Sequence, residues 1–127
     1  MRRALILIIT LSLLCFGAGL KLDRLQVSTA QQYLNRLHGL RMLVEDEAFS
    51  DASAGQRSLH AQWLRDEKWM NCLISHHHTR AVSEAMRQLE TALRMGCQVE
   101  SMQAVNDALD ALEEIRDAHL ITLQNVW

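Results

Sequence analysis

The sequence predicts an all-α protein, in which an N-terminal transmembrane helix is followed by an antiparallel up-and-down bundle of about four helices. Three observations favour this class. The 127 residues include no proline and only five glycines, whereas ordinary globular chains contain about 5% proline and about 7% glycine. Both residue types disfavour helix interiors. An uncharged run begins at residue 4, and later segments carry apolar residues at helical spacing.

The first twenty residues predict a signal anchor. The chain then divides into a membrane segment over 1–20 and an extracytoplasmic helical bundle over 21–127. Residues 4–20 carry no charge and reach roughly 26 Å at ~1.5 Å per residue, which is at the short end for a membrane span. Because Arg2 and Arg3 precede the run, the expected protein crosses the cell membrane once, with its N-terminus in the cytoplasm.

Two other interpretations of this segment remain open. The small residues at 17–19 offer a site at which a peptidase could remove a signal peptide, and the protein would then be secreted. Lipidation of Cys15 is the third interpretation, although Leu14 occupies the position where a lipoprotein signal has a small residue. A buried soluble helix fits poorly with the arginine pair at the front of the run.

Residues 22–47 predict the first helix of the bundle. Its apolar stripe recurs at spacings of three and four, and consists of Ala30, Tyr33, Leu37, Leu40 and Val44, widened by Leu34 and Leu43. No proline or polar linker separates this stripe from the apolar run, so we expect one continuous helix. Three acidic residues at 45–47 end the pattern, because a helix C-terminus disfavours negative charge. Ser50 or Asp51 is expected to cap the next helix.

The second predicted helix carries tryptophan at two positions. Its face consists of Leu59, Trp63, Met70 and Ile74, with Trp69 and Leu73 beside it. Asp66 interrupts this face, and Gly55 weakens the prediction of where the helix begins. Core packing is one interpretation of Trp63 and Trp69, and a docking surface around Trp69 is the other.

Two further helices complete the predicted bundle. The third covers about 79–95, ends at Gly96, and has a stripe of Val82, Ala85, Met86, Leu89, Ala92 and Leu93. The fourth starts near Gln98, and its stripe consists of Met102, Val105, Leu109, Leu112 and Ile115, with Ala108 and Ala111 beside it. Short turns favour antiparallel neighbours, although two stacked helical hairpins also fit. An up-and-down order places His76 near residues 118–121, at the end facing the membrane and far from Phe49.

Short motifs near the middle and the end of the chain give a family resemblance. Leu-Ile-Ser-His at 73–76 is an apolar pair followed by a histidine at a helix start, and Leu-Gln-Asn-Val-Trp covers 123–127. With Trp63 and Trp69, these motifs make the chain similar to the bacterial family called domain of unknown function 4363. The resemblance spans nearly the whole chain and implies a membrane-anchored, extracytoplasmic helical protein without known catalytic residues. The chain departs from the family at Phe49, where tryptophan is expected, and in having His77 and His78.

The histidine run at 76–78 raises the question of a metal site. Consecutive helical residues point about 100° apart, so the three side chains do not converge on one ion from a regular helix. Cys72 and His76 are four apart and are expected to share a helix face, with His119 as a third ligand. A structural zinc site needs four ligands, and the sequence offers no fourth. A polar corner between two helices, or a pH-responsive contact, explains the histidines more simply.

Other chemistry finds little support in the residues. A net charge of −2 gives no electrostatic case for nucleic acid. Three cysteines at irregular spacing do not form a disulfide framework, and Cys72 and Cys97 are expected at opposite ends of the third helix. No phosphate-binding loop, serine elbow or inward Glu-x-x-His pair is present, so neither a cofactor nor an enzymatic activity is predicted.

The sequence therefore favours a non-enzymatic interaction or scaffold module that is anchored in the membrane through residues 4–20. Its expected partner is another membrane or envelope protein, and Trp69, Val126 and Trp127 are the candidate docking residues. The alternative is a metal-binding or pH-responsive sensor bundle that uses Cys72, His76 and His119.

Overall fold

The computed structural model describes the backbone of residues 1–126, and all of their side chains except those of residues 22, 23, 73 and 118–126. Within this part the chain forms four α-helices and no strand: α1 (Arg2–Glu45), α2 (Phe49–Leu73), α3 (His76–Met95) and α4 (Gln98–Val126). The predicted all-helical class, with a long apolar helix at the N-terminus, is confirmed.

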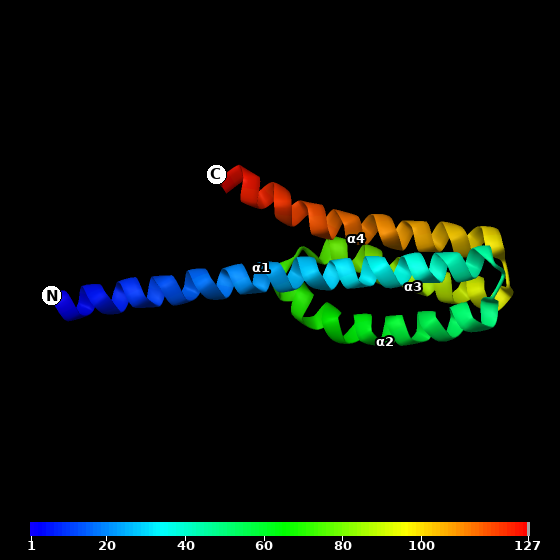
Figure 1. Cartoon of the computed structure of the whole chain (residues 1–127), viewed down its shortest axis with the longest axis horizontal. Helices are drawn as coiled ribbons and strands as arrows, with labels where there is room; N and C mark the ends of the chain where they lie inside the picture. Colours follow the sequence, from blue (N-terminus) through cyan, green and yellow to red (C-terminus); the bar gives the residue numbers. More distant parts are fainter. Residues whose placement is uncertain (127) are drawn as a thin grey trace.

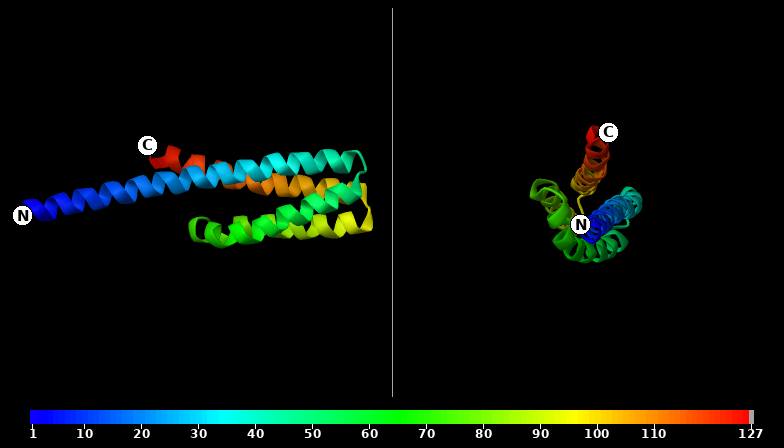
Figure 2. Two further views of the ribbon diagram at one scale, coloured as in Figure 1. Left: turned by 60° about the horizontal axis from the view of Figure 1, so that its bottom comes forward. Right: turned by 90° about the vertical axis from the view of Figure 1, so that its left-hand side faces the viewer.

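The helices run back and forth along one direction. α1 packs against α2 and α4, and α3 also packs against α2 and α4, so each helix has two neighbours. Both ends of the chain lie on the same side of the packed region, and α1 extends far beyond the other three helices (Figure 1). Figure 2 shows the same arrangement from a second side and along the length of α1.

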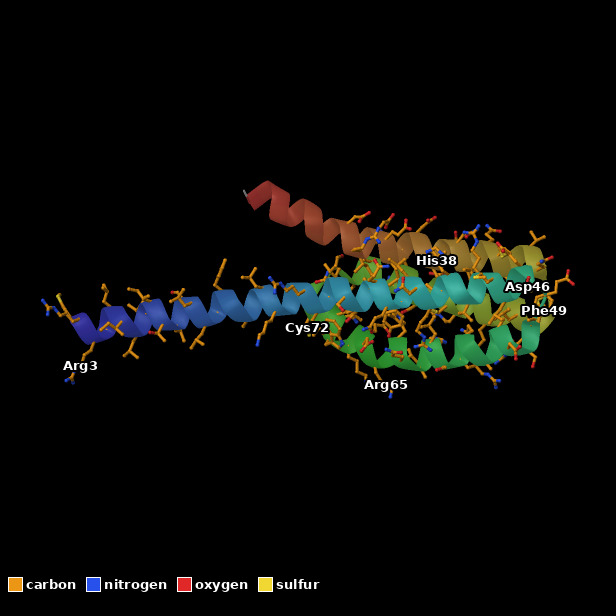
Figure 3. The ribbon with its side chains drawn as sticks, in the orientation of Figure 1. Arg3, His38, Asp46, Phe49, Arg65 and Cys72 are labelled. Carbon is orange, nitrogen blue, oxygen red and sulfur yellow. The ribbon has the colours of Figure 1, made fainter. Side chains whose placement is uncertain are left out.

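α1 is one unbroken helix of 44 residues, as the lack of a linker predicted. Its first part is long and apolar enough to cross a membrane, and none of that stretch is buried within the protein. Leu7 and Phe16 are 69% and 63% exposed, for example, and the side chains of this part project into open space in Figure 3. The second part of α1 belongs to the core.

The predicted stripes meet in one hydrophobic core. Trp63, Leu59 and Met70 of α2 are fully buried, and so is Leu89 at the middle of α3. Leu43, Phe49, Trp69, Ile74 and Met102 are partly buried and pack against this core. The remaining core residues are Ala30, Tyr33, Leu34, Leu37, Leu40, Val44, Ala52, Val82, Ala85, Met86, Leu93, Ala104, Val105, Ala108, Leu109, Ala111, Leu112 and Ile115.

α1 and α3 end in the same hydrogen-bonded motif. At the end of α1, Ala48 N donates to Leu43 O (2.9 Å) and Glu47 N donates to Val44 O (3.0 Å). After α3, Cys97 N donates to Ala92 O and Gly96 N to Leu93 O, both at 3.2 Å. This is the Schellman pattern, which requires a residue in the left-handed region. After α3 that residue is Gly96 (φ 65°), as predicted. After α1 it is Glu47 (φ 58°).

Two predicted helix starts are wrong. α2 begins at Phe49, before Ser50 and Asp51, and Ala48 precedes it without a side-chain cap. The reason is that the motif ending α1 leaves Ala48 directly at the start of α2. α3 begins at His76 instead of about Thr79, because Ser75 caps it and accepts a hydrogen bond from His77 N (3.3 Å).

Two residues of the second predicted helix also differ in their roles. Ile74 lies outside α2 in extended backbone, although it still packs against the core. Gly55 lies inside α2, and a Cβ built on it would stand 2.8 Å from Cδ2 of Leu40 in α1. The glycine therefore marks a close approach of α1 and α2 instead of a helix boundary.

Candidate functional site

The predicted metal ligands flank the turn between α2 and α3. Cys72 is exposed in the last turn of α2, where its Sγ donates to Lys68 O (3.7 Å), and His76 is exposed at the start of α3. The expectation that they share a helix face is wrong, because the helix breaks at Ile74 between them. The side chain of His119 lies outside the described residues. Among the side chains that are described, no three of ligand type are grouped to hold a metal ion.

His78 makes the contact between this turn and α4. Its Nδ1 lies 3.9 Å from Oε2 of Glu114. That nitrogen is buried and has no hydrogen-bond partner, while the neighbouring His77 is exposed. The contact places the histidine turn beside the later part of α4. Cys72 accordingly lies at the opposite end from Asp46 and Phe49 in Figure 3.

The histidine turn is closed by hydrogen bonds of a structural kind. Thr79 is 1% exposed, and its Oγ1 is within hydrogen-bond distance of Asn71 Oδ1 in α2 and of His76 O (3.2 Å). Such bonds satisfy polar groups at the facing ends of two helices. These contacts agree with the interpretation of the run as a helix corner.

A polar cluster that the sequence reasoning missed lies between α1 and α2. The Tyr33 hydroxyl donates to Asp66 Oδ2 (2.6 Å), and Trp69 Nε1 donates to Asp66 Oδ1 (3.1 Å). Burial raises the pKa of Tyr33 well above its ordinary value, and the hydrogen bond to Asp66 and the charge of that carboxylate act in the same direction. Tyr33 is therefore a neutral donor. The interruption of an apolar face by Asp66 was the signal in the sequence.

The cluster continues into α3 through Trp63. The rings of Tyr33 and Trp63 meet edge to face, with centroids 5.4 Å apart. Trp63 Nε1 donates to Ser83 Oγ (2.8 Å), and Ser83 Oγ donates to Glu67 Oε1 (3.1 Å). Both carboxylates thus have defined partners in helix packing, and three helices are connected through them.

The predicted docking residues have different outcomes. Trp63 is fully buried, and Trp69 is partly buried, packs against the core and donates to Asp66. Trp63 therefore belongs to the core, while Trp69 packs against the core and stays partly exposed, so that its docking role remains a prediction. The side chain of Val126 and the whole of Trp127 lie outside the described residues.

An open groove lies between α3 and α4. It has a volume of about 640 Å³. Buried Ala92 and Ala104 contribute to its lining with little side-chain volume. The other lining residues are polar or charged, namely Glu84, Arg87, Gln88, Thr91, Glu100 and Gln103. Enclosed, largely apolar pockets suit small molecules, whereas an open polar groove suits a contact with another protein.

Comparison with known proteins gives one match. The family model described as "Domain of unknown function (DUF4363)" matches residues 23–126. This range begins after the apolar run and covers the second part of α1 together with α2, α3 and α4. Neither a curated protein nor a solved structure matches the chain.

Proposed function

The chain belongs to the domain of unknown function 4363 family, and from this premise we propose that it is a non-enzymatic module, anchored in a membrane, that holds another membrane or envelope protein in position. The observation that carries the proposal is the continuity of α1. A single helix of 44 residues provides both the exposed apolar run and a full side of the packed core. The bundle is thereby joined to the proposed membrane span without a flexible linker.

Continuity has a mechanical consequence. Flexible linkers allow a domain to sample many distances and orientations, but a helix advances by ~1.5 Å per residue with fixed rotation. A bundle of antiparallel up-and-down helices attached in this way would stand at a fixed height and orientation on the membrane. This suits a protein that positions a neighbour better than one that diffuses to distant targets.

The proposed orientation places the bundle outside the cytoplasm. Arg2 and Arg3 precede the apolar run, and positive charge favours the cytoplasmic side of a span. The distal end then consists of the turns at Phe49 and Gly96, and the histidine turn faces the membrane.

The groove between α3 and α4 is the proposed docking surface. Arg87, Glu84 and Glu100 offer charges of both signs along it, and Ala92 and Ala104 leave room for a partner side chain. An amphipathic segment of the partner laid along two helices would use this kind of surface. The partner is a protein of the same membrane or of the envelope next to it.

Site-specific photocrosslinking in native membranes tests the proposal. A photoreactive amino acid at Gln88 or Gln103, on the two sides of the groove, is expected to capture the same protein. Arg65 on α2 is exposed, lies outside the groove lining and is the matched control. Capture from all three positions equally, or from none, would contradict the proposed surface.

A further inference from the structure

Two opposite sides of the bundle carry opposite charge. α2 and α4 lie along opposite edges of the packed region (Figure 1), and each of them packs against α1 and α3. Among the described side chains of residues 54–72, the exposed charged residues of α2 are all basic, namely Arg57, Arg65 and Lys68. Among those of residues 98–117, the exposed charged residues of α4 are all acidic, namely Glu100, Asp107, Asp110, Glu114 and Asp117.

The outer face of α2 is basic because the acids of this segment serve helix packing. Asp66 and Glu67 are partly buried and accept hydrogen bonds from side chains of α1, α2 and α3. Arg65, in contrast, projects away from the bundle in Figure 3. Exposed Ala61 and half-exposed Leu64 lie between the basic residues. A small and an apolar residue at this place allow a second helix to approach closely.

The charges on the two faces match in their spacing. α2 and α4 run in the same direction, and both begin at the distal end of the bundle. Arg65 and Lys68 follow the first residue of α2 by 16 and 19 residues, and Glu114 and Asp117 follow the first residue of α4 by the same numbers. An acidic pair with the same spacing stands at 107 and 110. A shift of about two helical turns therefore also keeps the match.

We propose that copies of this chain associate side by side, with the basic face of α2 in one copy against the acidic face of α4 in the next. The contact is head to tail, because the two faces lie at opposite edges of one copy. Such contacts build rows, or rings where the rotation closes. All copies stand the same way up, because the paired helices run in the same direction, and copies anchored in one membrane share that orientation.

This contact is separate from the proposed partner of the groove. Asp107, Asp110, Glu114 and Asp117 are not among the residues that line the groove between α3 and α4. A copy on the outer face of α4 can therefore bind beside a partner that lies in the groove. The inference goes beyond the proposed function, since it names a second copy and a different surface.

The contact is expected to be weak for bundles that are free in solution. Single exposed ion pairs contribute little to association. Salt screens charges beyond about 8 Å at physiological ionic strength, so only charges that face each other directly contribute, and matched spacing is essential. The proposed anchoring would strengthen the contact, because confinement raises the effective concentration of the copies.

Cysteine crosslinking of the full chain in the cells that express it tests the contact. The three native cysteines are replaced by serine, and Ala61→Cys and Asp110→Cys are introduced. Both positions are exposed and follow the first residue of their helix by 12 residues. A short membrane-permeant bismaleimide is expected to give a ladder of dimers, trimers and longer products, because each copy carries one thiol on each face.

Matched controls define the geometry of the contact. Chains with only Ala61→Cys or only Asp110→Cys should stay monomeric, because a head-to-tail contact brings unlike faces together. Ala61→Cys combined with Gln88→Cys on α3 should give no ladder either. Dimers from a chain with one cysteine would show a two-fold contact and would overturn the inference.

Charge reversal identifies the force that holds the copies together. Arg65→Glu with Lys68→Glu should abolish the ladder of the two-cysteine chain, and so should Glu114→Lys with Asp117→Lys. Co-expression of the two reversed chains should restore it, because each reversed face then meets its complement. Cooperative melting of both purified chains near the parent temperature is expected, since exposed substitutions change stability little.

The outcomes separate clearly. A ladder that each reversal abolishes and co-expression restores supports the inference. A ladder that reversal does not change, or monomers alone from the two-cysteine chain, would overturn it. The photoreactive amino acid at Arg65 should in addition capture a second copy of this chain, which differs in mass from the protein captured through the groove.

Discussion

Among individual residues, Asp66 has the most unexpected role. It stands within an apolar helix face because both of its carboxylate oxygens accept hydrogen bonds, from Tyr33 and from Trp69. A half-buried carboxylate is costly unless it is bonded. The partner Tyr33 lies 33 residues earlier in the chain, so the sequence showed the interruption but not its explanation.

Tyr33→Phe should change how stability depends on pH. Burial raises the pKa of Tyr33, so its contribution to stability is full below the ordinary tyrosine pKa near 10 and is lost as pH rises above it. The melting temperature of the parent protein should therefore fall more steeply between pH 9 and about 11 than the melting temperature of Tyr33→Phe. At neutral pH the variant should be less stable by roughly 1–2 kcal/mol, for one lost bond to a charged acceptor. Equal alkaline slopes would contradict this.

Leu89→Asp should unfold the bundle. Leu89 is fully buried at the centre of α3, and an unpaired carboxylate there costs several kcal/mol, against a typical domain stability of ~5–15 kcal/mol. Its exposed neighbour Gln88 provides the control, because Gln88→Asp places the same charge in solvent and should melt within a few degrees of the parent protein. Cooperative melting of Leu89→Asp at an unchanged temperature would show that this stripe is not the core.

At the scale of helices, the C-terminal ends of α1 and α3 can be compared directly. α1 and α3 end in the same hydrogen-bonded motif, but the left-handed residue is Glu47 in one case and Gly96 in the other. A side chain in that conformation costs roughly 1–2 kcal/mol, and a negative charge at a helix C-terminus is unfavourable as well. The same turn is therefore strained after α1 and relaxed after α3.

Opposite substitutions should have opposite effects at these two turns. Glu47→Gly is expected to stabilise the protein by about 0.5–1 kcal/mol, because relief of strain exceeds the entropy that glycine adds to the unfolded chain. Gly96→Ala should destabilise it by about 1 kcal/mol for the converse reason. Denaturant unfolding of both variants measures the effect, and a change of the same sign in both would show that the left-handed conformation does not limit stability there.

The helices themselves could be predicted from periodicity, but their starts and polar contacts could not. Most residues of the four stripes are buried as expected, because apolar spacing depends only on local helix geometry. The start of α2 was missed because it depends on Glu47, a residue type that rarely adopts the left-handed conformation. Cys72 and His76 do not share a helix face, because α2 ends at Leu73 and Ser75 caps a new helix that begins at His76. The groove between α3 and α4 depends on how two helices pack, which no single stripe reveals.

For the whole molecule, the proposed membrane anchoring raises the question of which side of the membrane the bundle would occupy. Cys72 is exposed on the bundle, and Cys15 lies in the apolar run. A membrane-impermeant thiol reagent applied to intact cells is expected to label Cys72, and Cys97 more slowly because it is only partly exposed. Cys15 should stay unlabelled within the bilayer. Labelling of Cys72 only after the cells are permeabilised would place the bundle in the cytoplasm.

The unbroken α1 also fixes an angle. Each helical residue turns the chain by about 100° about the helix axis. The number of residues between the apolar run and the core therefore determines the rotational orientation of the bundle about the axis of α1. One residue added after Leu20 would turn the groove between α3 and α4 by about 100° about the α1 axis, and four residues would bring it back to within about 40° of its original orientation. If α1 anchors the bundle as proposed, a partner in the membrane would meet a different face in each case, so the number of residues in this stretch would matter independently of their side chains.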